Sequence, residues 1–475
     1  MDNVIDTVEI LSKTVSLCPE CMTRIPARRV ARGDQVWLEK TCPEHGEFQT
    51  KIWQGVSSFQ NWVRPKIPGV INIPYTEVKR GCPFDCGLCP SHRQHTCTAV
   101  IEVTQRCNLQ CTFCFADAGS NSVDPDQETV RSWFQSLLNA GGPYNVQISG
   151  GEPTMRDDLP ELVAMGRAMG FHFIQLNTNG LRLSWDRNYL EALKQAGLDS
   201  IFLQFDGTEP EIHRYMRGGD ILAQKLKTIQ QCGELGIGVV LVPTVVPGVN
   251  DHNLGEIIDL AMENMPAVKG VHFQPASYFG RIPHAPSDQQ RITLPEVMTK
   301  IEEQTNGRIQ TGNFRPSGCE NAMCSFQGHF ILMPEDQIKA TTKHEPEKSC
   351  CAPPEHAVEG AKKAREFVST HWSAAKPENK SQGCGCNSGS CDEPSSQPDT
   401  TDFAPDSLDL FLERAKTYSL TITGMAFMDA WNFDLERVMD CCIHTVAPDG
   451  KIIPFCAYNV SDTSGRSLYR GRTAD

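Results

Sequence analysis

Short apolar runs alternate with longer amphipathic stretches between residues 99 and 274. The apolar, β-branched runs are typical of buried strands, and the amphipathic stretches have the periodicity of surface helices. Strand and helix repeated at this spacing, in six βα units, predict an α/β fold with a parallel sheet. The predicted strands are residues 100–104, 146–149, 171–177, 200–205, 239–246 and 271–274, and the predicted helices are 126–139, 159–169, 187–196, 220–235 and 254–264.

Different patterns flank this alternating region on both sides. Before it, strand-like residues 35–38 follow a turn at Gly33, and a proline-containing arm leads into the core. After it, we expect helices over 294–307 and 356–372, whereas the polar stretch 377–405 has a composition typical of disorder. We therefore divide the chain into residues 1–60, 61–98, a core at 99–290, a C-terminal region at 291–345 and 406–475, and an insert at 346–405.

Composition narrows the classes of protein that remain. The chain has 475 residues, a formal net charge of −14 and a pI of about 5.4, which argues against an extended nucleic-acid surface. No run of about 18 apolar residues occurs, so we expect no membrane span. The start of the chain lacks a basic, apolar signal, so we expect a cytoplasmic protein. Its 21 cysteines then indicate metal or redox chemistry rather than a disulfide framework.

Three cysteines follow the first predicted strand of the core at short spacing: Cys107, Cys111 and Cys114. Three thiolates on one loop can hold three corners of a [4Fe–4S] cluster, which leaves the fourth iron without a protein ligand. A small molecule can chelate that open iron. A zinc site or a group of buried thiols is the alternative, although three close cysteines without a nearby fourth make a poor zinc tetrahedron.

Two ligand pairs lie near the start of the chain. Cys18 and Cys21 enclose a Pro-Glu pair, and so do Cys42 and His45, with a predicted hairpin between the two pairs. Thiolates and one imidazole at this spacing predict a tetrahedral site for zinc or a mononuclear iron. The alternative is that His45 is a surface turn residue that leaves only the three cysteines as ligands.

Another cysteine group precedes the core. Cys82, Cys86 and Cys89 repeat the spacing of the core loop, and Cys97 follows eight residues later. Four thiols are enough for a fully ligated cluster with an electron-transfer or structural role. A second zinc knuckle is the alternative.

The C-terminal region carries further cysteines. A third cluster is plausible from four ligands that are distant in sequence, and buried free thiols are the alternative. The predicted ligands are Cys319, Cys324, Cys442 (or Cys441) and Cys456. No role is assigned to Cys350, Cys351, Cys384, Cys386 and Cys391.

Polar motifs lie where the predicted parallel strands end. Ser-Gly-Gly-Glu-Pro at 149–153 ends the second strand, where glycines let the backbone approach a ligand and Glu152 can accept from an ammonium group. Gln204 and Asp206 lie two residues apart, so both can point at a ligand. His272 and Gln274 alternate on the last strand and are candidate substrate contacts. The carboxyl ends of parallel strands are where such sheets carry their chemistry.

The cysteine loop, with Phe113 before its last cysteine, and the motif Gly150, Gly151, Glu152 and Pro153 one βα unit later resemble the radical S-adenosylmethionine (radical SAM) superfamily. The resemblance implies a partial (β/α)6 TIM-like barrel, with a rubredoxin-like metal knuckle before it and an auxiliary-cluster segment after it. It implies a SAM-binding [4Fe–4S] cluster on Cys107, Cys111 and Cys114, with the glycine-rich motif at the SAM amino group. Further residues implied to lie near SAM are Asn177, Asn179, Gln204 and Asp206 at its ribose and carboxylate, and Val245 at its adenine.

The order of the knuckle, the two cysteine loops and the C-terminal cysteines also resembles the tetraether lipid synthase group and its lipid- or pterin-modifying methylase-like relatives. The tail around 425–431, 441–444 and 454–459 resembles the group called TrsS. The resemblance implies a 5′-deoxyadenosyl radical that acts on an unactivated C–H, by C–C coupling or methylation, in a small-molecule or lipid substrate. It also implies one or two auxiliary [4Fe–4S] clusters and an external electron donor such as flavodoxin or ferredoxin. The alternatives are a multi-cluster redox or metal-handling protein and a peptide-modifying radical SAM maturase.

Overall fold

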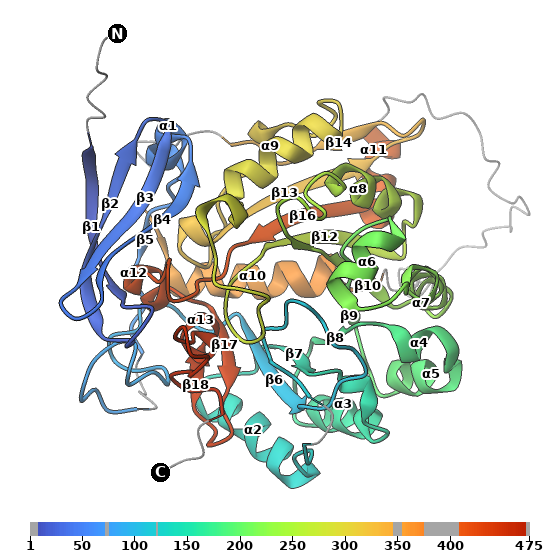
Figure 1. Ribbon diagram of the computed structural model, residues 1–475. Helices are drawn as coiled ribbons and strands as arrows, with labels where there is room; N and C mark the ends of the chain where they lie inside the picture. The colour runs from blue at the N-terminus through green and yellow to red at the C-terminus, as the bar shows by residue number, and fades with distance from the viewer. Residues whose placement is uncertain (1–7, 72–75, 120–121, 345–353, 375–407, 472–475) are drawn as a thin grey trace, which may run out of the picture.

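The computed structural model describes residues 8–71, 76–119, 122–344, 354–374 and 408–471 of the chain. Figure 1 shows a small antiparallel sheet beside a larger α/β body, with part of the C-terminal segment between them. The polar stretch 377–405 lies outside the described residues, as do Cys350, Cys351, Cys384, Cys386 and Cys391. Among the described helices, none combines the length and the apolar character needed to cross a bilayer.

Four antiparallel strands build the N-terminal sheet, and each pairs with the next along the chain. The sheet docks on the C-terminal segment through Arg29, whose guanidinium lies 2.6 Å from the carboxylate of Asp434. The hydroxyl of Thr14 donates to the same carboxylate at 2.8 Å. The strands are β1 (Glu9–Leu17), β2 (Arg24–Arg32), β3 (Gln35–Cys42) and β4 (Gly46–Gln54).

The body is built on one large sheet, whose central strands are parallel and follow the predicted order. All seven residues of its first strand are buried, because that strand is covered on both faces. The six predicted strands are confirmed, with small shifts at their ends. They are β6 (Thr98–Thr104), β7 (Asn145–Gly150), β8 (Ile174–Thr178), β9 (Ser200–Gln204), β10 (Gly238–Val242), continued by β11 (Thr244–Val245), and β12 (Val268–Pro275).

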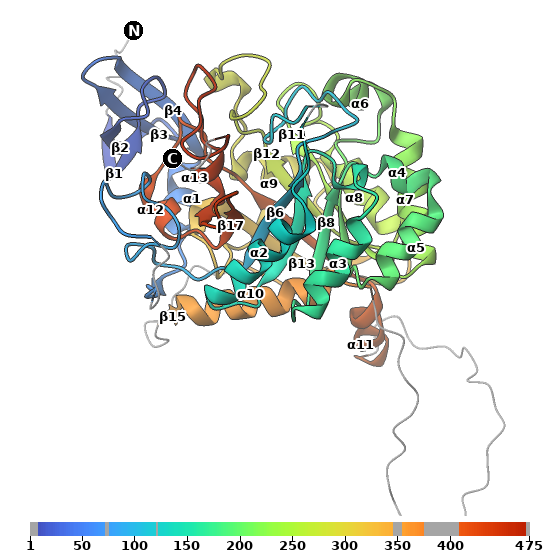
Figure 2. The same cartoon turned by 90° about the horizontal axis from the view of Figure 1, so that it is seen from below.

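Helices cover the outer face of these strands, as Figure 2 shows. The five predicted helices are present, and two short ones were not predicted. Asp126 caps the first predicted helix, because its side chain accepts a hydrogen bond from the N–H of Thr129 at 2.8 Å. The predicted helices are α2 (Gln127–Asn139), α3 (Leu159–Ala168), α5 (Arg187–Gln195), α7 (Leu222–Glu234) and α8 (Leu254–Glu263), and the others are α4 (Leu181–Trp185) and α6 (Pro210–Arg217).

The C-terminal region completes both edges of the same sheet. Strand β16 (Ser419–Met425) pairs in parallel with β12, and β17 (Ile443–Val446) pairs in parallel with β6 at the opposite edge. These strands were not predicted, because both stand outside the strand–helix alternation. Further antiparallel strands are β13 (Ser325–Leu332) and β14 (Ile338–Ala340) beside β16, and β18 (Ile452–Pro454) beside β17.

Helix α10 (Ala357–His371), predicted over 356–372, lies along the lower side of the body in Figure 2. The side chain of Arg365 donates a hydrogen bond to the backbone oxygen of Thr96 at 2.8 Å. The backbone oxygen of Arg365 accepts one from the side chain of Asn145 at 3.1 Å. The helix therefore joins the sheet to the segment before it. The remaining elements are α1 (Val56–Asn61), β5 (Lys66–Ile67), α9 (Leu294–Gln304), β15 (Glu355–His356), α11 (Leu408–Thr417), α12 (Leu435–Met439) and α13 (Phe455–Asn459).

Candidate active site and metal centres

A cavity of about 520 Å³ lies inside the curved sheet. The loop after β6 lines one part of it with Cys107, Cys111 and Cys114. Side chains of the strands, such as Phe202, line the middle, and Phe367 of α10 lines another part. His272 and Gln274 also line it. The predicted cysteine loop and several strand-end residues therefore face one common space.

Backbone hydrogen bonds hold the cysteine loop on two sides. Cys114 exchanges two with Arg281, at 3.0 and 2.9 Å, and the N–H of Thr112 donates to the oxygen of Met216 at 3.0 Å. Burial raises the pKa of the Cys107 thiol to about 11. Among the described residues, two groups of potential ligands place all their ligand atoms within 4.8 Å of one another, and this trio is not one of them. The three sulfurs are therefore spread more widely than one tetrahedral zinc ion requires, which favours a cluster.

Glu152 lines the cavity although its side chain is almost completely buried. Its Oε1 accepts from the N–H and the hydroxyl of Thr154, at 3.1 and 2.6 Å, and from the hydroxyl of Thr178 at 2.6 Å. Its Oε2 accepts from the N–H of Asn179 at 2.7 Å. All these donors are neutral, and Oε2 retains a lone pair. The carboxylate therefore fits an ammonium group as a further donor.

Gly150 and Gly151 are required by a close approach of two backbones. A Cβ on Gly150 would lie 2.1 Å from the oxygen of Thr104, and one on Gly151 would lie 2.2 Å from the oxygen of Arg106. The N–H groups of Gly151 and Glu152 donate to those same two oxygens, both at 2.8 Å. The glycines line the cavity, as predicted for a ligand contact, but their tightest contacts are with the start of the cysteine loop. This contact places Glu152 beside that loop.

Three predicted amide side chains also line the cavity. Asn177 has a buried Oδ1 without a hydrogen-bond partner, so it fits a hydroxyl donor of a bound molecule. Asn179 donates to the side chain of Asn108, within the cysteine loop, at 2.7 Å. Gln204 accepts at Oε1 from the ammonium of Lys225 at 2.9 Å.

The other predicted contacts take different places. Asp206 is completely buried, pairs with Arg217 and accepts a hydrogen bond from the side chain of Gln204. The two predicted residues therefore lie together, but protein partners take up the carboxylate, which does not line the cavity. Val245 is also buried, and its oxygen accepts from the N–H of Ala276 at 3.0 Å. Pro153 is buried at the start of a short 3₁₀ turn, η1 (Pro153–Met155). Lining residues without a local sequence motif were missed: Thr178, Arg217, Thr244, Phe202 and Phe367.

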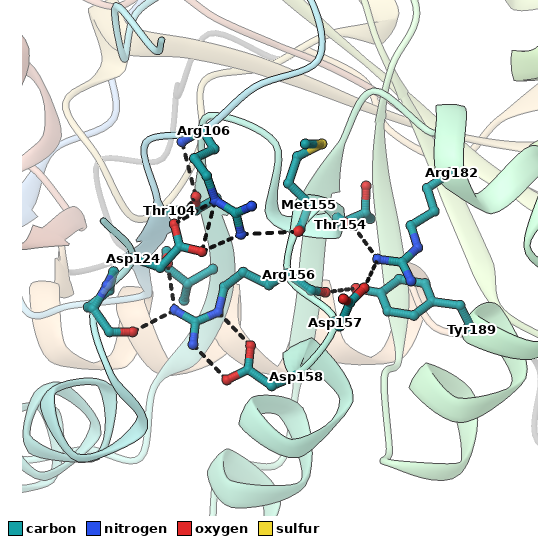
Figure 3. A network of polar contacts seen from close by, with 12 residues as sticks. Thr104, Arg106, Asp124, Thr154, Met155, Arg156, Asp157, Asp158, Arg182 and Tyr189 are labelled. Atoms are coloured by element: carbon teal, nitrogen blue, oxygen red, sulfur yellow. Dashed lines mark hydrogen bonds and ion pairs between the residues drawn. The ribbon is translucent and has the colours of Figure 1, made fainter. Parts of the chain in front are cut away.

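A network of charged side chains fixes the turn after β7, as Figure 3 shows. Arg156 pairs with Asp158 at 2.7 Å and donates to the oxygen of Val103, in β6, at 2.9 Å. Arg106 pairs with Asp124 and donates to the oxygen of Met155 at 3.1 Å. The turn that carries Glu152 is therefore tied to the strand and loop that carry the cysteines.

The two ligand pairs of the N-terminal sheet come together. The potential ligand atoms of Cys18, Cys21, Cys42 and His45 lie within 4.8 Å of one another. The hydrogen bond with His45, 3.4 Å from Sγ to Nδ1, lowers the pKa of the Cys42 thiol to about 6. Burial raises the pKa of the Cys18 thiol to about 11. Four N and S donors at this separation fit one tetrahedral ion.

Cys97 lies in a different group from the one predicted. Its thiol is within hydrogen-bonding range of Cys319 and Cys442, and these contacts hold the pKa of Cys97 well below its usual range. The carboxylate of Glu320 accepts from Cys442 at 3.5 Å, and Cys319, Glu320 and Cys442 form a compact buried group. Cys97, Glu320 and Cys442 line the cavity. The sequence grouped Cys97 with its near neighbours, because folding that joins distant segments leaves no local pattern.

Apart from Cys232, which is buried in α7, the remaining described cysteines divide into two further groups. Cys82, Cys86 and Cys89 stay together, and the backbone N–H of Cys86 donates to the hydroxyl of Tyr469 at 2.8 Å. Three members of the predicted third group stay together, because Cys324 and Cys456 lie near Cys441, the predicted alternative to Cys442. The fourth predicted member, Cys319, lies instead with Cys97 and Cys442. The buried Arg437 donates to Cys324 at 3.3 Å.

The chain resembles known proteins both in two of its segments and over nearly its full length. The profile described as "Radical SAM superfamily" matches residues 101–261, and the one described as "HMPTM N-terminal zinc ribbon domain" matches residues 10–54. The chain is 38% identical to a 7,8-dihydro-6-hydroxymethylpterin dimethyltransferase of Methanocaldococcus jannaschii, over 94% of this chain and 93% of the relative.

Two more distant likenesses cover 38% of the chain each. The chain is 32% identical to a GTP 3′,8-cyclase of Alkaliphilus oremlandii, over 38% of this chain and 58% of the cyclase. The structure of Streptococcus suis SuiB bound to S-adenosylmethionine superposes with a TM-score of 0.33 at 18% identity, over 38% of this chain and 39% of SuiB. From the near full-length match and the two profiles, the chain belongs to the family of the Methanocaldococcus jannaschii protein within the radical SAM superfamily, and it is a radical SAM enzyme with an N-terminal zinc ribbon.

Proposed function

We propose that Cys107, Cys111 and Cys114 hold a [4Fe–4S] cluster that binds SAM in the cavity. The convergence of these three thiols and the Glu152 carboxylate on one space carries the proposal. Such a cluster supplies the electron that cleaves SAM into methionine and a 5′-deoxyadenosyl radical. When SAM is bound, Glu152 would accept a hydrogen bond from the SAM ammonium, and Oδ1 of Asn177 would accept one from a hydroxyl.

We propose a pterin-like small molecule as the substrate and methylation as the reaction, with a second SAM molecule or another one-carbon donor as the methyl source, because the cleavage leaves the first methyl group on methionine. The name of the full-length relative supports this choice, and so does an aromatic wall in the cavity. The ring of Phe202 lies 5.3 Å from His272 and 5.7 Å from Trp372, between centroids, and flat heterocycles stack on such surfaces. Burial lowers the pKa of His272 to about 4, so its ring is neutral at pH 7 and can hydrogen-bond a heterocycle.

A lipid chain is the second candidate substrate, in line with the resemblance to the tetraether lipid synthase group. A second aromatic cluster of the cavity favours it. The ring of Phe455 lies 5.7 Å from Phe115, 6.4 Å from Phe279 and 4.5 Å from Phe427. All four of these rings line the cavity, and none of them offers a hydrogen bond. Radical C–C coupling at an unactivated chain end is the reaction that this substrate implies.

The other cysteine groups are proposed as metal sites. The N-terminal zinc ribbon would hold zinc or a mononuclear iron on Cys18, Cys21, Cys42 and His45. Auxiliary [4Fe–4S] clusters would be held by the group around Cys82, Cys86 and Cys89, and by the group of Cys97, Cys319 and Cys442. An external donor such as flavodoxin or ferredoxin would deliver the electron, in the cytoplasm.

Anaerobic reconstitution with iron and sulfide tests the proposal. The protein receives SAM and dithionite, and 5′-deoxyadenosine is quantified for the wild type and for the triple variant Cys107→Ala, Cys111→Ala, Cys114→Ala. Cys232→Ala, at a buried position in α7, is the control for loss of a buried thiol. We expect product from the wild type and the control only.

Separate incubations with a dihydropterin and with an archaeal-type lipid then distinguish the substrates, by transfer of label from methyl-labelled SAM or by a coupled lipid product. Equal 5′-deoxyadenosine from the triple variant and the wild type would refute the cluster assignment. Loaded wild-type protein that forms no product with either substrate would favour the redox or metal-handling alternative, and modification of a peptide would favour the maturase alternative.

A further inference from the structure

Arg217 is a buried arginine at the end of α6, beside the cysteine loop. Its side chain is 6% exposed, and that of its partner Asp206 is 0% exposed. Two hydrogen bonds join the pair, from Nε to Oδ2 at 2.6 Å and from Nη2 to Oδ1 at 2.8 Å. The N–H of Thr244 also donates to Asp206, at 3.2 Å. The carboxylate thus holds the guanidinium in one orientation.

The other side of this guanidinium faces the cysteine loop. Arg217 lines the cavity together with Cys111, lies close enough for the two side chains to interact electrostatically, and donates to the backbone oxygen of Phe113 at 3.4 Å. The preceding residue, Met216, accepts from the N–H of Thr112 at 3.0 Å. The end of α6 therefore contacts three consecutive residues of the loop and brings a cation to one of its sulfurs.

A fixed cation beside a sulfur ligand changes the energetics of reduction. Arginine stays protonated in proteins, and a buried charge interacts more strongly than one in water. Reduction adds one electron, and therefore one negative charge, to an iron–sulfur cluster. Hydrogen bonds to the sulfurs and the local charge set the reduction potential of such clusters. A cation next to Cys111 stabilises the reduced state relative to the oxidised state.

We propose that Arg217 is a positioning residue that raises the reduction potential of the cluster on Cys107, Cys111 and Cys114, with Asp206 holding it against Cys111. This inference rests on the proposed cluster site. Its consequence is that SAM cleavage in this enzyme begins at a less negative potential than the cysteine loop alone would give.

The chain offers a matched pair as a control. Arg291 and Asp429 have the same side-chain exposures, 6% and 0%, and two hydrogen bonds of 2.9 Å join them. Arg291 packs its guanidinium on the ring of Tyr278, 5.0 Å from the centroid. Asp429 also accepts from the N–H of Tyr278 at 3.0 Å, and the Tyr278 ring packs on Phe113. Loss of this pair therefore tests the effect of removing a buried ion pair that supports the cysteine loop through packing, without a cation beside Cys111.

The experiment compares the double variants Asp206→Asn/Arg217→Gln and Asp429→Asn/Arg291→Gln, which remove both charges of each pair. Iron content is measured first, and the cluster whose electron paramagnetic resonance signal changes on addition of SAM is then titrated against electrode potential. Asp206 offsets part of the field of Arg217, so we expect the first variant to shift the reduction equilibrium at fixed potential up to about tenfold toward the oxidised state, or about 59 mV for one electron. We expect the second variant to retain the wild-type potential, while both lower the unfolding temperature.

Arg217→Lys keeps the charge but not the planar fork, so we expect a smaller shift in the same direction. This variant decides the question if the double variant does not load iron. A loaded cluster with an unchanged potential in these variants would overturn the inference, as would weaker SAM binding without a shift, which would make Arg217 a SAM contact. Wild-type protein that holds no SAM-responsive cluster would instead refute the proposed function.

Discussion

Replacing Glu152 with glutamine tests the assignment of its carboxylate as the acceptor for the SAM ammonium. The carboxylate accepts four hydrogen bonds, from Thr154, Thr178 and Asn179. A glutamine amide keeps one acceptor and turns the other oxygen into a donor, so a buried N–H must face another donor. That mismatch costs about 1–3 kcal/mol, and weaker remaining bonds add roughly 1 kcal/mol. We therefore expect the free energy of unfolding to fall by about 2–4 kcal/mol.

The same replacement removes a charge-assisted hydrogen bond to SAM. Such a bond contributes about 1.5–3 kcal/mol, so we expect SAM to bind roughly 10- to 100-fold more weakly. Equilibrium dialysis of labelled SAM against anaerobically reconstituted protein measures the affinity, and urea unfolding measures the stability. Glu161→Gln, at an exposed position of α3, is the control and leaves both unchanged. A Glu152→Gln protein that loses stability but binds SAM with wild-type affinity would refute the role of this carboxylate.

Three further changes have distinct expected outcomes. Gly151→Ala forces a Cβ against the start of the cysteine loop, so we expect most of the SAM-responsive cluster signal to be lost. The control Gly312→Ala, where a Cβ meets no atom within 4 Å, should retain the signal. Equal cluster loading of the two variants would contradict this expectation. Cys97→Ala and Cys319→Ala should each abolish the same electron paramagnetic resonance signal of the reconstituted protein, because both thiols belong to one group. Loss of a different signal in each variant would show that the two cysteines bind different metal centres. Burial lowers the pKa of His272 to about 4, below about 6.5 in the unfolded chain, so the unfolded state binds the additional proton and stability falls as pH drops from 6.5 through 4. We expect His272→Gln to reduce that fall by up to about 3 kcal/mol in urea unfolding, and an unchanged pH profile would argue against it.

Sequence patterns predicted the parts of the fold that are built from neighbouring segments. The alternation from β6 to β12 was readable because each buried strand is followed by its own helix. The edge strands β16 and β17 were not, because each pairs with a strand far away in the chain, as Gly270 does with Thr421. The apolar residues of β16 do alternate, at Leu420 and Ile422, but this local pattern does not show which strand β16 pairs with, and the four residues of β17 are too few to show a period.

For the site as well, groups of residues that are close in sequence were predicted, whereas groups formed by distant segments were not. The ligand group of the zinc ribbon was predicted because its two pairs lie on one hairpin. Cys97 was grouped with its near neighbours, whereas its thiol meets Cys319 and Cys442, which come from distant segments. Asp206 was placed at the ligand by strand periodicity, but Arg217 binds it instead. A buried ion pair between a loop residue and the end of a helix leaves no pattern in sequence.

The pairing of β17 with β6 has a consequence for the order of events during synthesis. Strand β6 carries the cysteine loop at its end, yet its outer edge stays unpaired until residues 443–446 have left the ribosome. The thiol of Cys97 likewise cannot contact Cys442 until that residue has been synthesised and has left the ribosome. A nascent chain that has completed the central strands thus exposes a bare strand edge and an incomplete set of ligands. Metal insertion at that group must follow translation, and a folding helper that shields the edge of β6 would act at this stage.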